Sequence, residues 1–201
     1  MSARELALRR GLQLEYLTIG WNLLEALVGI IIASVSGSVA LLGFGLDSGI
    51  EVFSGAVLLW RLKSDHSMGE SAERTAIRLV GASFLILSAY ILYEAASAWF
   101  LREAPQRTRA GIVLAIVSVI VMPMLARAKR RVARDLGSGA LQADSRQSDF
   151  CAYLSGILLI GLLLNAALRW WWADPAAALA MVPLIAREGV EGVQGKTCCE
   201  S

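Results

Sequence analysis

The sequence predicts an all-α membrane protein, a bundle of six transmembrane helices without a sizeable soluble domain. The first observation is composition, since 56% of the 201 residues are hydrophobic and the mean hydropathy is +0.58. Soluble domains average about 45–50% even when glycine is counted. The second observation is a series of long runs that are almost free of charge. The third is that basic residues cluster between these runs, which indicates membrane topology and argues against nucleic-acid binding.

Six apolar runs are candidates for membrane-spanning helices. At a rise of about 1.5 Å per residue, the longer ones cross a hydrocarbon core of about 30 Å. The fourth is short, and Pro183 is expected to split the sixth, which opens with Asp174 as a cap and Pro175 in its first turn. We expect a transporter domain over residues 1–187 and a short cytoplasmic tail over 188–201. The expected limits of the runs are 12–35, 39–62, 76–100, 111–126, 136–168 and 171–187.

The basic residues orient the chain in the membrane. Most of the 19 Lys and Arg residues lie in the N-terminal segment, the second and fourth loops and the tail. The opposite side holds Arg102, Arg107, Arg109 and Arg169. Because Lys and Arg are enriched in cytoplasmic loops, both termini are expected in the cytoplasm. We expect a multi-pass protein of the inner or plasma membrane if it is bacterial, and no cleaved signal peptide.

Two acidic residues interrupt the second run, in "LLGFGLDSGIEVFSGAVLLW". Asp47 and Glu51 are four residues apart, so they share one face of a helix. Each charged carboxylate at the bilayer centre costs about 2.5–3.5 kcal/mol or more. Two neighbouring carboxylates also repel each other unless a cation lies between them, and protons can relieve that repulsion when the cation leaves. This pair therefore predicts exchange of a metal ion for protons.

The sequence also matches itself at an offset of 100 positions. Gln147 then aligns with Asp47, and Cys151 aligns with Glu51. If this is a true repeat, the second and fifth helices face a shared site, as in other transporters built from repeats. Chance similarity among small residues is the alternative. The identical residues are Gly37, Ser38, Ala40, Leu41 and Ser48 with Gly137, Ser138, Ala140, Leu141 and Ser148.

The aligned side chains suggest a ligand set for a metal ion. Two carboxylates, the amide oxygen of Gln147 and the thiolate of Cys151 make four ligands, the number preferred by tetrahedral Zn²⁺. A thiolate favours a softer divalent metal over Mg²⁺ or Ca²⁺. Asp144, one turn before Gln147, is an alternative ligand or a carboxylate on the access route. The alternatives are that Gln147 only forms a hydrogen bond between helices and that Cys151 is a small buried hydrophobic residue.

Other polar and sulfur groups are candidates for accessory roles. Asn22 and Glu25 form a second polar pair at helical spacing, in the first run. A structural role, with hydrogen bonds inside the bundle, is the alternative for Glu25. Three cysteines give no disulfide framework, and the adjacent Cys198 and Cys199 of the tail are expected to be free thiols or contacts for a soft metal.

These motifs resemble the cation diffusion facilitator family of zinc and related divalent-metal exporters. "GSVALLGFGLDSGIEVFSG" fits the family's second helix, with Asp47 and Glu51 at the ligand positions. "LQADSRQSDFCAYLSG" keeps Asp144 in register and places Gln147 and Cys151 at the ligand positions of the fifth, and "WWADPAAAL" is similar to the family's "DP..AL" signature. Neither ligand frame contains histidine, and the residues after Arg187 are too few for the family's metal-sensing domain. This short form resembles the transmembrane protein 163 branch, which implies a homodimer.

The sequence as a whole predicts a transporter that exports a divalent transition metal, with Zn²⁺ as the expected ion. The expected mechanism is alternating access, with metal ion, protons, lipid bilayer and a second copy of the chain as partners. Two alternatives stay open: a metal-binding membrane regulator or partner subunit that moves no ion, and a passive cation channel. We do not expect an enzyme, because the chain has no nucleophile–base pair, no phosphate-binding loop and no histidine in its spans.

Overall fold

The structure, a computed structural model, describes residues 3–63, 70–102 and 105–194, and Cys198 and Cys199 lie outside these ranges. Within them the chain forms six α-helices joined by short connections, with no strand. The predicted six-helix, all-α architecture is therefore confirmed. The helices are α1 (Ala3–Ser36), α2 (Val39–Lys63), α3 (Glu70–Leu101), α4 (Arg109–Leu136), α5 (Gly139–Leu168) and α6 (Ala173–Val193).

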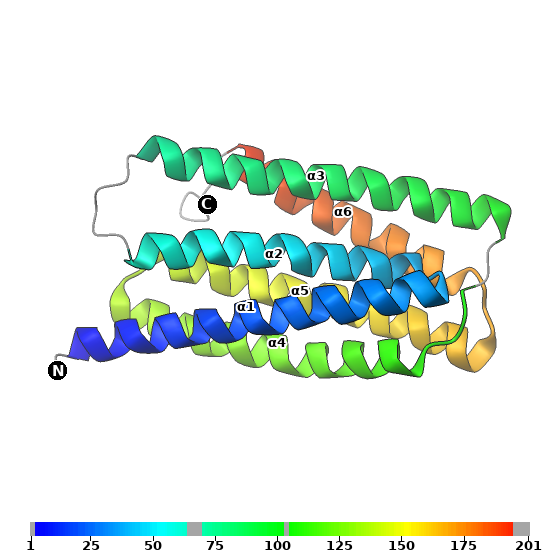
Figure 1. Ribbon diagram of the computed structural model, residues 1–201, viewed down its shortest axis with the longest axis horizontal. Helices are drawn as coiled ribbons and strands as arrows, with labels where there is room; N and C mark the ends of the chain where they lie inside the picture. The colour runs from blue at the N-terminus through cyan, green and yellow to red at the C-terminus, as the bar shows by residue number, and fades with distance from the viewer. Residues whose placement is uncertain (1–2, 64–69, 103–104, 195–201) are drawn as a thin grey trace.

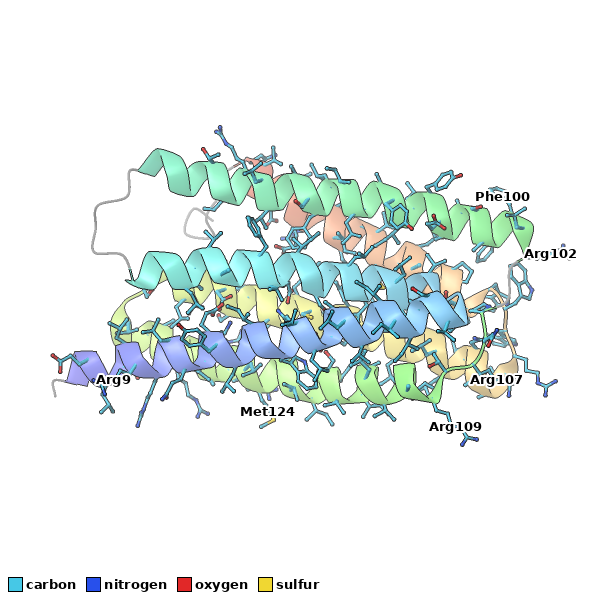
Figure 2. The ribbon with its side chains drawn as sticks, viewed as in Figure 1. Arg9, Phe100, Arg102, Arg107, Arg109 and Met124 are labelled. Atoms are coloured by element: carbon cyan, nitrogen blue, oxygen red, sulfur yellow. The ribbon has the colours of Figure 1, made fainter. Side chains whose placement is uncertain are left out.

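The helices form one elongated bundle with α2 near its centre. Helices α1, α2, α4 and α5 lie along the long axis, and α3 runs beside them with α6 crossing obliquely beneath it (Figure 1). The most extensive contacts are those of α3 with α6, α4 with α5 and α1 with α2, while α2 also touches α3, α5 and α6. Helix α1 begins at one end of the bundle, and α6 runs back toward that end (Figure 1). We call this the Arg9 end, and Arg102, Arg107 and Arg109 lie at the other (Figure 2).

Five of the six helices, all except α6, are long and apolar enough to cross a membrane. The sequence predicts six such spans. Helix α6 has only 21 residues and carries Asp174, Arg187 and Glu188 within them, which lowers its hydropathy. It packs along α3 and against α2 and α5, so it belongs to the bundle, and its crossing of the membrane stays a prediction.

Several helices differ from their expected limits, and α1 and α3 begin at Ala3 and Glu70, before the expected positions 12 and 76. Helix α4 continues through Pro123 and ends at Leu136, ten residues beyond the expected position 126. Helix α6 continues through Pro183 and ends at Val193, so the proline does not split it and the expected end of this helix at 187 is wrong. A proline removes a single backbone donor, and packing against neighbouring helices can hold the helix together around it. Helix α5 begins at Gly139, three residues after the expected position 136, because a turn separates it from α4.

The internal match at offset 100 corresponds to a repeated joint between helices. Gly37 and Gly137 both adopt a left-handed conformation, with φ of 69° and 61°. The next residue caps the following helix in each case, because the Ser38 and Ser138 hydroxyls accept hydrogen bonds from the amides of Leu41 (3.1 Å) and Leu141 (3.3 Å). The two joints lie at opposite ends of the bundle (Figure 1). The α1–α2 and α4–α5 hairpins are thus inverted relative to each other, and α2 runs antiparallel to α5.

Asp174 does not cap its own helix, contrary to the prediction. Helix α6 has Trp172 at its N-cap, without a side-chain cap. The Asp174 carboxylate instead accepts hydrogen bonds from the Ser38 hydroxyl and from the amides of Val39 (2.8 Å) and Ala40 (3.4 Å). The first residues of α6 therefore supply the N-terminal cap of α2, because the unpaired amides of that helix point at them.

A close glycine contact sets the distance between α1 and α2. A Cβ atom on Gly45 would lie 3.0 Å from the backbone nitrogen of Ile30, and one on Gly29 would lie 3.3 Å from the Cα of Gly45. Small residues allow such close approach of helices in membranes. The contact brings the polar residues of α1 within reach of the acidic residues of α2.

Candidate metal centre

Three predicted ligands converge in the interior of the bundle. Carboxylate oxygens of Asp47 and Glu51 and the Sγ of Cys151 all lie within 4.8 Å of one another. Asp47 and Cys151 are fully buried and Glu51 is 5% exposed. The two carboxylates share one face of α2 because they are four residues apart, and the thiol reaches them from α5. Three ligand atoms this close to one another can bind a single metal ion.

Several oxygen atoms at this centre lack a hydrogen-bond partner among the described residues. They are both carboxylate oxygens of Asp47, Oε1 of Glu51 and Oδ1 of Asn22. Buried oxygen atoms without a partner are costly, and buried charges in proteins are paired or coordinate metals. The carboxylate oxygens belong to the converging cluster, and Asn22 is bonded to one of its members, so a cation bound among these side chains would satisfy the unpaired carboxylates.

Helix α1 closes one side of the centre. The Asn22 amide nitrogen donates to Oε2 of Glu51 at 2.7 Å. The Glu25 carboxylate accepts hydrogen bonds from the Ser48 hydroxyl (3.2 Å), the Cys151 thiol (3.9 Å) and the indole nitrogen of Trp21. The structure thus places both predicted accessory residues, Asn22 and Glu25, in direct contact with the predicted ligands.

Gln147 lies beside the centre and points its amide oxygen elsewhere. Its Oε1 accepts a hydrogen bond from the Ser54 hydroxyl at 3.4 Å. The offset of 100 had paired Gln147 with Asp47, but antiparallel packing of α2 and α5 reverses that order. Cys151 therefore sits at the level of both carboxylates, and Gln147 sits one turn further toward the Arg9 end.

Asp144 belongs to a different cluster. Its carboxylate contacts the Lys129 ammonium, which also lies 2.9 Å from Oε2 of Glu15. Glu15 and Lys129 are not predicted from the sequence as members of an interior cluster. Lys129 stands in a basic segment that reads as a topology signal, and Glu15 stands near the start of the first run. The sequence position of neither residue distinguishes it from the other charged residues nearby.

Comparison with known proteins agrees with this geometry. Residues 16–193 match the family described as the cation efflux transmembrane domain. The chain belongs to the cation efflux family. The match covers most of the chain and all of the residues of the candidate centre. With its apolar helices, this membership makes the protein an integral, multi-pass membrane protein.

Three relatives place this member within the family. Transmembrane protein 163 of Xenopus laevis is 26% identical over 190 residues, which are 91% of this chain and 66% of that protein. An uncharacterized transporter of Synechocystis sp. is 29% identical over 156 residues, covering 74% of this chain and 50% of the relative. Magnetosome protein MamB of Magnetospira sp. is 25% identical over 184 residues, covering 88% and 61%. The chain thus spans between half and about two thirds of the length of these relatives.

Proposed function

We propose that this protein transports divalent transition-metal ions, with Zn²⁺ as the preferred ion, out of the cytoplasm in exchange for protons. The observation that carries the proposal is the buried convergence of Asp47, Glu51 and Cys151 from two helices. Carboxylates inside a membrane are expensive and mark ion pathways. Membership of the cation efflux family supports transport as the activity.

We further propose that Asn22 supplies the fourth ligand in place of Gln147. Its amide nitrogen donates a hydrogen bond to Glu51 at 2.7 Å, and its Oδ1 has no hydrogen-bond partner among the described residues. The oxygen of Gln147 already accepts a hydrogen bond from Ser54. Two carboxylates, an amide oxygen and a thiolate then make the four ligands that Zn²⁺ prefers.

Coupling to protons follows from the chemistry of these ligands. Thiols and carboxylates bind metal in their deprotonated form, so metal binding displaces protons and protonation displaces metal. A buried site with neither metal nor protons would leave two adjacent negative charges unpaired. Exchange of the two kinds of ion at one site therefore avoids an unfavourable intermediate.

Alternating access is the mechanism we propose. The centre lies between α1 and α2 of one hairpin and α5 of the inverted hairpin, the arrangement of transporters built from inverted repeats. Rocking of one hairpin against the other would open the centre to each side in turn. A homodimer forms part of the proposal through the family resemblance, and chemical crosslinking in membranes tests it.

The test of the proposal is metal flux in proteoliposomes that contain a fluorescent Zn²⁺ probe. We expect Zn²⁺ movement that is driven by a pH gradient and stops when a proton ionophore dissipates the gradient. Zn²⁺ binding without flux in correctly inserted protein would contradict transport and favour the regulator. Flux with a conductance and without dependence on the pH gradient would favour the channel.

Replacing Cys151 with serine is expected to alter the metal preference. The substitution exchanges the only soft ligand for a hard hydroxyl, so affinity for Zn²⁺ should fall by roughly tenfold or more and affinity for Mn²⁺ should fall less. Equilibrium binding of the two metals to the purified protein in detergent measures the difference. A variant with serine at 198 and 199 provides the control, and equal losses for both metals would contradict a role of the thiolate as ligand.

A further inference from the structure

A second buried charge cluster lies between the metal centre and the Arg9 end of the bundle. It contains Lys129 of α4, Glu15 of α1 and Asp144 of α5. The side chains of Lys129, Glu15 and Asp144 are 0%, 1% and 15% exposed. Because both carboxylates contact the same ammonium nitrogen, they lie close enough to each other to share one ion.

The cluster lies one to two helical turns from the metal centre along α2 and α5, toward the Arg9 end. A Cβ atom on Gly55 would lie 2.7 Å from Oε1 of Glu15, and Gly55 is one helical turn beyond Glu51 on α2. Asp144 lies two turns before Cys151 on α5. The hydrogen bond between Ser54 and Gln147 spans the interval. The two clusters therefore occupy successive levels between α1, α2 and α5.

The charges of this cluster do not balance. Two carboxylates face a single ammonium group, and Oε1 of Glu15 has no hydrogen-bond partner among the described residues. A divalent ion would neutralise both carboxylates, whereas the lysine neutralises one. A lysine side chain also has a long flexible stem that allows its ammonium to move toward the membrane interface. Asp144 is partly exposed, which provides contact with the outside of the bundle.

We propose that Glu15 and Asp144 form an outer cation site on the route to the metal centre, and that the Lys129 ammonium fills this site until a divalent metal ion displaces it. The ion is the one assigned under the proposed function, and the inference rests on that proposal. When the Lys129 ammonium returns to the two carboxylates, it displaces the metal ion from the outer site. The ion then moves on to Asp47, Glu51 and Cys151. Lys129 thus acts as a tethered counter-ion.

Replacement of Lys129 with methionine tests the proposal by counting bound metal. Met keeps an apolar stem of similar length and removes the competing charge. We expect purified K129M in detergent to bind one more Zn²⁺ per chain than the wild type in equilibrium dialysis. The added substitutions E15Q and D144N should remove that extra ion. K129M that is folded, by circular dichroism and size-exclusion chromatography, and binds no extra Zn²⁺ would overturn the proposal.

The same experiment separates this inference from the proposed function. In the double variant D47A/K129M, the outer site should still bind Zn²⁺ although the central site is damaged. Loss of all binding in that variant, with the protein folded, would overturn an independent outer site. If the protein shows no transport in proteoliposomes but K129M still binds the extra ion, the proposed function is contradicted. The outer site is supported in that case.

A kinetic measurement covers the case in which K129M does not fold. E15Q and D144N each leave Lys129 one carboxylate, so both variants should fold. Removal of one negative charge from the access route should lower the association rate of Zn²⁺ by about tenfold. Stopped-flow measurement of the tryptophan fluorescence, to which Trp21 contributes through its indole contact with Glu25 at the centre, reports arrival of the ion. Association rates equal to the wild type in both variants would overturn the proposal.

Discussion

Asp47→Asn is expected to abolish proton-coupled metal movement while leaving the fold intact. Both oxygens of Asp47 are buried without a hydrogen-bond partner among the described residues, and the side chain is fully buried. Asparagine has the same shape, but it cannot supply a negative ligand or carry an exchangeable proton. Since even residues that only orient a ligand contribute about 10–100-fold to metal affinity or activity, loss of a ligand should reduce flux at least about 100-fold.

Stability should respond in the opposite direction to transport. A buried carboxylate without a partner is costly, so its neutral isostere should leave the free energy of unfolding unchanged or raise it. Such opposition is common where a functional site holds groups that destabilise the folded state. A decrease in flux together with increased stability would separate a functional role from a structural one.

Flux in proteoliposomes and the thermal midpoint in detergent measure the two effects. The matched control is Asp149→Asn on α5, whose carboxylate pairs with Arg130 at 2.5 and 3.1 Å and is 29% exposed. Such a partly exposed pair contributes little to stability, and the partner of Asp149, Arg130 of α4, is not one of the residues of the candidate centre. Flux by Asp47→Asn equal to that of Asp149→Asn would contradict the assigned site.

The sequence was informative where local chemistry alone determines the structure. Long apolar runs predicted the helices because the hydrocarbon core requires them. The four-residue spacing of Asp47 and Glu51 placed both on one face, as the structure shows. Cys151 was assigned to the same site through the repeat, and the identical joints at Gly37 and Gly137 give that repeat a structural basis.

The remainder depends on how helices pack, which local patterns do not encode. An offset in the sequence cannot show that α2 and α5 run antiparallel. Gln147 was therefore aligned with Asp47, although it lies one turn from the centre toward the Arg9 end. Asp174 follows the rule for an N-cap within its own segment, but its partners are the amides of a helix about 135 residues earlier. Lys129 is indistinguishable from its basic neighbours until α1 and α5 are brought against it.

Asp174→Ala is expected to produce the largest loss of stability. The carboxylate caps α2 from another helix, and it accepts hydrogen bonds from the amides of Val39 and Ala40 and from the Ser38 hydroxyl. Removing an N-cap costs about 0.5–2 kcal/mol, and each buried donor left without a partner adds about 1–3 kcal/mol. We expect the free energy of unfolding to fall by about 2–4 kcal/mol.

Denaturation of the purified protein in mixed micelles measures this change, with Asp174→Asn and Ser38→Ala for comparison. Asn keeps one acceptor oxygen, so its loss should be smaller than that of Ala. Ser38→Ala removes one donor to the carboxylate, and its effect should not add to that of Asp174→Ala because the two side chains form one network. Unfolding of Asp174→Ala at the wild-type midpoint would show that the amides of α2 find other partners. A coupled loss would instead show that the contact between the first turn of α6 and the first turn of α2 holds α2, and with it Asp47 and Glu51, in place beside Cys151.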